Sequence, residues 1–119
     1  MNNSILSEIA TVLTALSVPH ETGVFAAPEP DIYAVIVPLV DTFEVEADDI
    51  PNAETQEARI ALFSKSNYRP TANNIIKALL RAGLTVTARQ FIEYESDTGY
   101  HHFNIDVAQA YDYNTNEEE

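Results

Sequence analysis

The 119-residue chain contains no cysteine and only three glycines, and no lysine or arginine precedes Arg59. Without cysteine, neither a disulfide framework nor a metal site with thiolate ligands can form. So few glycines do not provide the glycine-rich loops that bind phosphate groups. No apolar run approaches the roughly 18 residues of a membrane-spanning helix, and the start MNNSILSEIA lacks the basic segment of a signal peptide. The sequence therefore predicts a soluble intracellular protein that does not contact a membrane.

The charge of the chain is strongly one-sided. Nineteen acidic residues against six basic ones give a formal net charge of −13, and eleven of the acidic residues precede Arg59. These are Glu8, Glu21, Glu29, Asp31, Asp41, Glu44, Glu46, Asp48, Asp49, Glu54 and Glu57. Such a surface repels phosphates and argues against DNA or RNA binding. The excess acid either serves solubility alone or marks a surface that must avoid, or imitate, nucleic acid.

Hydrophobic periodicity predicts a single α+β domain over residues 1–113, with an acidic, disordered tail at residues 114–119. Helical spacing of apolar residues predicts two helices, at residues 4–17 and 71–82. Strand patterns occur at residues 32–39, 41–47, 55–63, 84–94 and 100–111. Residues 18–30 are interpreted as a loop with a short extended piece at residues 21–25. The order α-β-β-β-α-β-β favours a largely antiparallel sheet with two helices packed on it.

The second predicted helix carries its apolar residues on one face, which we expect to pack on the sheet. They are Ala72, Ile75, Ile76, Leu79 and Leu80. In this arrangement Ile76 and Leu80 lie in the core, whereas Lys77 and Arg81 lie on the solvated face. Pro38, near the end of the first strand, predicts a sheet edge or a bend.

The stretch DTGYHHFNIDV at residues 97–107 combines two adjacent histidines with two aspartates. Neighbouring residues on a strand point to opposite faces, so His101 and His102 cannot readily chelate one metal ion. His102 and Asp106 share a strand face but lie roughly 13 Å apart by strand rise. His20 is remote in the sequence. The sequence therefore predicts no metal site.

The same stretch holds the triplet Asp97-Thr98-Gly99, which aspartic proteases of the retroviral type use in pairs. Here the triplet falls at the tip of a hairpin, where Asp and Gly are ordinary turn residues. The serines and histidines show no nucleophile–base signature, and no pair of carboxylates stands out for acid–base chemistry. The sequence thus predicts no catalytic residue, no cofactor and no enzymatic activity.

Two longer stretches resemble small tail proteins of siphophages and prophages of Gram-positive bacteria. They are ETGVFAAPEPDIYAVIVPLVDTF and EARIALFSKSNYRPTANNIIKALLRAGLTVTARQFIEYESDTGYHHFNIDV. The resemblance is to the tail-terminator and tail-completion (neck) group, and it covers roughly residues 18–111. The closing hairpin and the segment FSKSNYRPTANNIIKALLRAG are its most particular parts. The order of the predicted elements is also similar to that of the tail-terminator fold.

This resemblance implies a structural virion protein that forms a ring, commonly hexameric, at the head-proximal end of the tail tube. Such a ring stops tube growth and presents a surface to the head–tail connector. The implied partners are therefore further copies of the chain, the tail tube protein and the connector protein. The implied locations are the virion tail and, during assembly, the host cytoplasm. In such a ring the excess acid could line a passage through which DNA slides without adhering.

The composition also supports a different hypothesis, an acidic DNA mimic or inhibitor of phage origin that occupies a basic DNA-binding cleft. A mimic needs carboxylates in phosphate-like rows, whereas a ring protein needs them on one lumenal or rim surface. A small enzyme is a third hypothesis, which the lack of a catalytic constellation disfavours.

Overall fold

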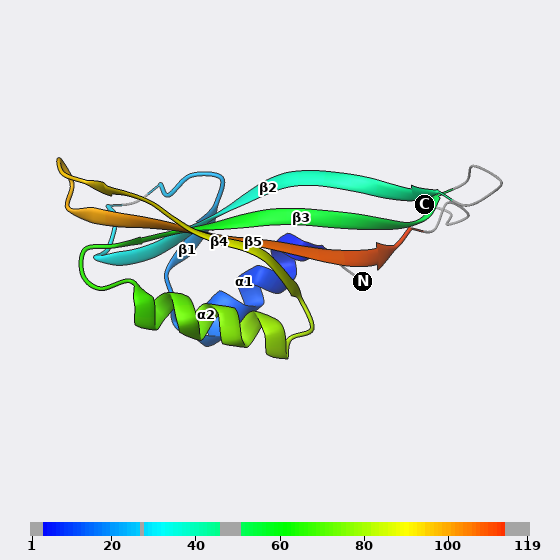
Figure 1. Ribbon diagram of the computed structural model, residues 1–119, viewed down its shortest axis with the longest axis horizontal. Coiled ribbons are helices and arrows are strands. Elements are labelled where there is room, and N and C mark those ends of the chain that lie inside the picture. The colour runs from blue at the N-terminus through cyan, green and yellow to red at the C-terminus, as the bar shows by residue number, and fades with distance from the viewer. Residues whose placement is uncertain (1–3, 27, 46–50, 114–119) are drawn as a thin grey trace.

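The computed structural model describes residues 4–26, 28–45 and 51–113 and shows an α+β domain (Figure 1). Two helices cover one face of a five-stranded sheet with the strand order β1-β2-β3-β5-β4. The elements are α1 (Ile5–Ala15), β1 (His20–Thr22), β2 (Ile32–Val45), β3 (Pro51–Ser64), α2 (Arg69–Arg81), β4 (Thr85–Glu95) and β5 (Tyr100–Asp112). β1 pairs in parallel with β2, and the other neighbours are antiparallel. The predicted fold class and order of element types are confirmed, while the predicted tail at residues 114–119 lies outside the described residues.

The first three strands differ in detail from the prediction. The segments 32–39 and 41–47 do not form two strands, because β2 runs through both as far as Val45. The order of element types still has three strands after α1, because the three-residue strand β1 precedes β2. A bulge between Pro38 and Val40 shifts the register of β2 on β3, after which pairing resumes. Pro38 is tolerated because β1 pairs only with Ala34 to Ile36, so β2 has a free edge beyond that point.

Polar contacts at the N-terminal end of α1 attach this helix to the sheet. The Ser4 hydroxyl accepts hydrogen bonds from the backbone N–H groups of the first turn, which satisfies donors that a helix start leaves open. The N–H of Ile5 donates to the side-chain oxygen of Gln56 on β3 at 2.7 Å. The Tyr111 hydroxyl on β5 donates to the Glu8 carboxylate. Burial, followed by this hydrogen bond, raises the pKa of Tyr111, so the phenol remains a donor at physiological pH.

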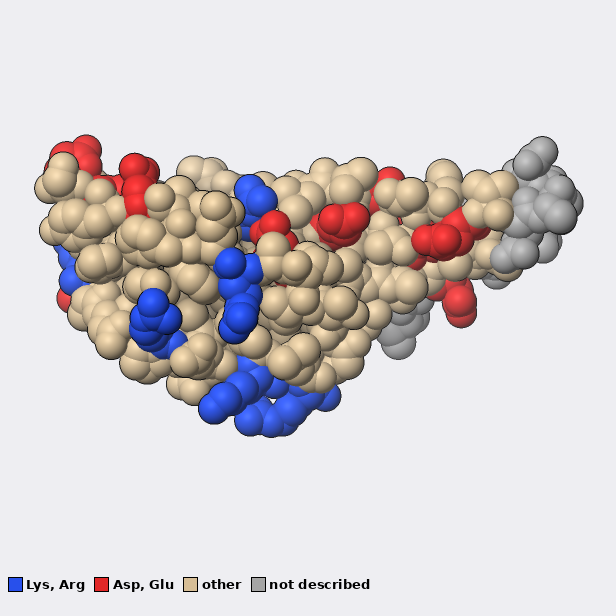
Figure 2. All heavy atoms as spheres, viewed as in Figure 1, with Lys and Arg blue, Asp and Glu red and all other residues tan. Residues whose placement is uncertain are grey.

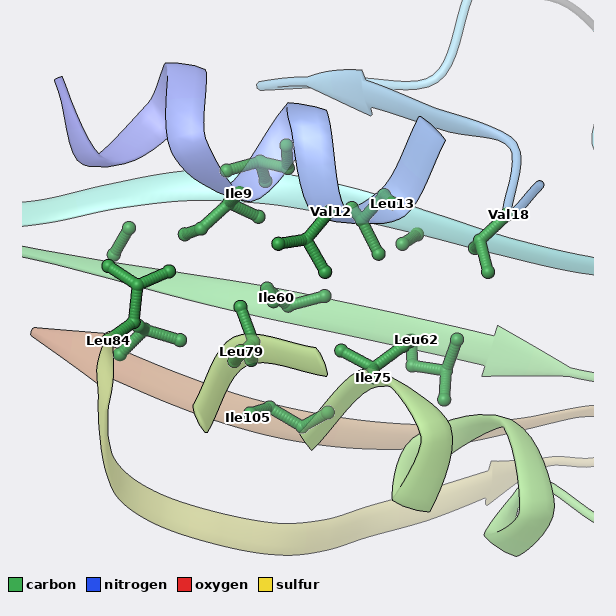
Figure 3. Packing of buried hydrophobic residues seen from close by; sticks show 14 of the residues in the cluster. Ile9, Val12, Leu13, Val18, Ile60, Leu62, Ile75, Leu79, Leu84 and Ile105 are labelled. Carbon is green, nitrogen blue, oxygen red and sulfur yellow. The ribbon is translucent and has the colours of Figure 1, made fainter. Parts of the chain in front are cut away.

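The hydrophobic core fills the space between the two helices and the sheet (Figure 3). α1 and α2 each send one apolar stripe into this space, and β2, β3 and β5 supply every second residue. The largest fully buried apolar side chains are Ile9, Leu13, Ile36, Ile60, Leu62, Ile75, Leu79, Ile105 and Val107. On β3, every second residue from Ala58 to Leu62 is fully buried.

The prediction that Leu80 lies in the core is wrong. Leu79 is fully buried, whereas the Leu80 side chain is 55% exposed, and Ile76 lies at the edge of the core. The buried stripe of α2 is centred on Ala72, Ile75 and Leu79. At 3.6 residues per turn, Leu80 lies about 100° around the helix from the centre of that stripe. The apolar face of α2 is therefore wider than the surface that the sheet covers.

The sheet extends well beyond the helices and gives the molecule an elongated shape (Figure 1). The principal extents are 53 × 26 × 26 Å. The projecting part contains residues 38–45 of β2, 51–57 of β3 and 109–113 at the end of β5, and we call it the arm. The start of α1 contacts the base of the arm at Gln56 and Tyr111. β4 begins opposite Ala108, so the arm has three strands. The turn between β4 and β5 lies at the opposite end of the molecule (Figure 1).

Candidate functional site

The two faces of the sheet have different surroundings. Residues directly paired across strands share a face, and successive residues alternate between faces. Ile60 on β3 and its partners Ile36 and Ile105 therefore face the helices, and all three are fully buried. Arg59 and its partner Asp106 face the other way. We call this second side the open face, because neither helix covers it.

Aromatic side chains cover the open face near the turn between β4 and β5. Tyr33 stacks on Phe63 with ring centroids 4.9 Å apart, and Phe63 stacks on His102 at 4.4 Å. Tyr100 packs edge-on against Tyr33 at 5.3 Å, and its hydroxyl donates to the carbonyl of Pro30 at 2.7 Å. Burial is the main cause that raises the pKa of Tyr33 to about 12, so this phenol stays neutral at physiological pH. The cluster ties the loop before β2 to the sheet and orients the His102 ring.

Acidic and basic side chains are segregated between the two sides of the molecule. Six of the eight carboxylates on β2 to β5 lie on the open face, by register. They are Glu44, Glu57, Glu93, Glu95, Asp106 and Asp112. The helix side carries Arg69, Lys77 and Arg81 on α2, and Figure 2 shows basic side chains gathered over the helices and acidic ones along the sheet. Arg59 on β3 also lies on the open face. Its guanidinium donates two hydrogen bonds to the Asp106 carboxylate, at 2.8 and 3.1 Å.

The arm carries exposed apolar side chains on both of its faces: by register Val40 lies on the open face with Glu57, whereas Phe43 lies on the helix side with Glu54. Leu39, Val40, Phe43, Val45 and Tyr113 are each 40% exposed or more. We call these five residues the arm patch. Phe43 and Tyr113 pack edge to face with ring centroids 4.8 Å apart, which holds both rings at the surface. Exposed apolar surface of this kind commonly marks a protein interaction site.

A second group of exposed apolar side chains lies on β4, which is an edge strand of the sheet. Phe91, Ile92 and Tyr94 are each 40% exposed or more, and we call them the β4 patch. Tyr94 packs beside the His101 ring at 4.8 Å, and Phe91 stacks on Tyr68 at 5.6 Å. The β4 patch therefore lies toward the end of the molecule opposite to the arm patch (Figure 1).

The two adjacent histidines point to opposite faces of the sheet, as the strand alternation predicts. His101 packs against Tyr94 on the helix side, whereas His102 stacks on Phe63 on the open face. They therefore cannot bind one ion together. Asp97 is exposed in the four-residue turn between β4 and β5, and Gly99 has a φ of +83°, which glycine adopts without strain. The Asp-Thr-Gly triplet is thus part of a turn at the surface, not of an apolar catalytic pocket.

Sequence reasoning missed one set of side chains that strand pairing brings together. Glu93 and Glu95 on β4 and His102 on β5 place their potential ligand atoms within 4.8 Å of one another. Only the register of the two strands creates this set, because His102 is seven and nine residues from the two glutamates in a region without a metal-binding motif. The prediction of no metal site considered the histidines along one strand and did not include the neighbouring strand.

Comparison with known proteins yields no relative, since neither a protein-family model nor a curated protein sequence matches the chain. Among the described residues, neither helix has the length and apolar character needed to cross a bilayer. The functional proposal therefore depends on the surfaces described above and on the resemblance to phage tail proteins.

Proposed function

We propose that the chain is a structural protein of a phage or prophage tail. It assembles into a ring at the head-proximal end of the tail tube, stops tube growth and helps to join the tail to the head. The observation that carries this proposal is the arm, which extends beyond the helices and presents exposed apolar side chains. Exposed apolar side chains on such an arm do not stabilise an isolated domain. In a subunit that contacts its neighbour, they can form the interface.

The positions of the two apolar patches support a ring in particular. A closed ring forms when one surface of a subunit binds a different surface of the next subunit and the rotation between neighbours returns to the first subunit. The arm patch and the β4 patch lie toward opposite ends of a molecule 53 Å long. In the proposed ring the arm patch of one copy packs on the β4 patch of the next. This arrangement repeats head to tail and needs no further partner to close.

The segregated charge supports the same role. With half of the six basic residues on α2, a ring can turn its acidic open face toward a passage for DNA. Like charge disfavours contact between that face and the DNA backbone. The proposed protein is therefore not an enzyme and does not bind nucleic acid. Its partners are other copies of itself, the tail tube protein and the connector, in the virion tail and in the host cytoplasm during assembly.

Ring formation is expected to depend strongly on salt. Thirteen net negative charges per chain oppose association, and salt screens them with a Debye length of about 8 Å at physiological ionic strength. Sedimentation velocity over a salt series should show monomer at low ionic strength and a closed oligomer at high ionic strength. Purified tail tubes should lower the salt concentration at which the oligomer appears.

Two outcomes would contradict this expectation. One is a sedimentation coefficient that stays at the monomer value at every salt concentration, with and without tubes. The other is stoichiometric inhibition of a DNA-binding enzyme by the monomer that weakens as salt is raised. The second result would favour the DNA-mimic hypothesis, because a mimic binds a basic cleft by charge.

A further inference from the structure

The geometry points to a binding site for a divalent transition-metal ion on the open face, formed by Glu93, Glu95 and His102. The potential ligand atoms of these residues lie within 4.8 Å of one another. Zinc bonds to carboxylate oxygen and imidazole nitrogen are about 2.0–2.2 Å long, so the ligand atoms must approach each other by at most about 1.5 Å. Glu93 is exposed and can make this adjustment by changing its rotamer. The site does not depend on the proposed assembly function.

A β-bulge creates the site by changing the face to which two side chains point. Phe91 pairs with Phe103, and the next pair is Glu93 with His102, so Ile92 is the extra residue. With regular pairing Ile92 would lie opposite His102, and Glu93 and Glu95 would point to the helix side. Because of the bulge, both carboxylates lie on the open face beside the imidazole. Bulges that redirect side chains in this way are common beside functional sites.

Contacts outside the set hold His102 in one orientation. Its Nε2 lies 2.9 Å from the side-chain oxygen of Asn104, which is buried, and the ring stacks on Phe63. An acceptor at Nε2 places the ring proton there and leaves the lone pair of Nδ1 for a metal ion. Metal-binding histidines usually have such a second hydrogen bond, which fixes the tautomer and the ring direction.

Glu95 is held in a similar way by the turn that follows it. The Thr98 hydroxyl donates to the Oε1 atom of Glu95 at 2.8 Å, which leaves Oε2 to face a ligand. Thr98 belongs to the Asp-Thr-Gly triplet, which therefore has a positioning role here. Two carboxylates this close together repel each other, and a cation between them removes that repulsion. The net charge of −13 favours a cation further.

The ligand set also indicates the class of ion. Calcium and magnesium prefer oxygen ligands alone, whereas imidazole favours zinc and related transition metals. One imidazole and two carboxylates leave at least one coordination position open toward the solvent. We therefore expect zinc to bind and calcium to bind at least tenfold more weakly.

Isothermal titration of the untagged full-length chain with zinc tests this proposal. We expect one zinc ion per chain, and His102→Phe, which keeps the stack on Phe63, should weaken binding by at least tenfold. Glu95→Gln should have a similar effect. Thr98→Ala should weaken binding by roughly tenfold, which is typical for loss of a residue that orients a ligand. The matched control is His101→Phe on the opposite face, which should bind zinc as the wild type does.

Measurements on the wild-type chain keep the test independent of how the variants fold. Zinc should raise the melting temperature of the wild type and shift the imidazole NMR signals of His102 but not those of His101. The proposal is overturned if zinc does not saturate a site on the wild type. It is equally overturned if folded His102→Phe binds zinc with unchanged affinity, or if His101→Phe loses as much affinity as His102→Phe.

Discussion

Replacing Leu79 by alanine is expected to lower the free energy of unfolding by about 2–5 kcal/mol. Leu79 is fully buried among core side chains, so its removal loses apolar burial and leaves a cavity. The free energy of unfolding of a whole domain is roughly 5–15 kcal/mol, so the variant should be close to unfolding at physiological temperature. Urea denaturation followed by circular dichroism measures the change.

The matched control is the neighbouring leucine on the same helix. Leu80→Ala should change the free energy of unfolding by less than about 0.5 kcal/mol, because the Leu80 side chain is 55% exposed. Alanine is also a slightly better helix former than leucine, which offsets part of any loss. Equal losses for the two variants would show that α2 lies on the sheet with a different face from the one described.

The two-patch arrangement predicts a mixing result that a symmetric interface cannot give. Phe43→Ser removes the central aromatic ring of the arm patch, and Phe91→Ser removes one from the β4 patch. Each variant alone should stay monomeric at salt concentrations where we expect the wild type to form rings, with at least tenfold weaker association. Aromatic side chains commonly dominate the affinity of protein interfaces, which is why a single change suffices.

An equimolar mixture of the two variants should form dimers and nothing larger. The Phe91→Ser subunit keeps an intact arm patch, and the Phe43→Ser subunit keeps an intact β4 patch, so one interface can form between them. The ring cannot continue, because the surfaces left free are the two damaged ones. Val24→Ser is the matched control, since Val24 is 72% exposed and outside both patches. Full rings from either patch variant, or a mixture that stays monomeric, would contradict the arrangement.

Much of the architecture follows from local patterns in the sequence. The stripes at Ile9 and Leu13 and at Ile75 and Leu79 repeat at helical spacing, and the alternation around Ile60 marks a strand with one buried face. Such patterns depend on neighbouring residues alone. They therefore predict the type of each element and the α+β class, which the structure confirms.

The features that were missed depend on contacts between distant parts of the chain. The apolar face of α2 includes both Leu79 and Leu80, and only the position of the sheet decides which is buried. The sequence indicates a short extended piece at residues 21–25, but only pairing with β2 makes the three residues of β1 a strand of the sheet. The two strands predicted at residues 32–39 and 41–47 are one strand, because pairing with β3 resumes after the bulge that follows Pro38.

The candidate sites were even less accessible to sequence reasoning than the fold. The set of Glu93, Glu95 and His102 exists because a bulge at Ile92 turns both carboxylates toward the neighbouring strand. No residue type in that segment signals the bulge. The alternating pattern around Phe43 is equally typical of a strand whose apolar face is covered by a helix. Only the structure shows that the sheet extends beyond the helices and leaves this side chain exposed.

Deletion of the gene tests the central claim most directly, because the proposal places this gene in a phage or prophage. We expect lysates with filled heads and with tails that are unjoined or of uncontrolled length, as seen by electron microscopy. Wild-type protein supplied from a plasmid should restore infectious particles, and the Phe43→Ser variant should not. Normal, infectious particles from the deletion strain would contradict the proposed role at the tail.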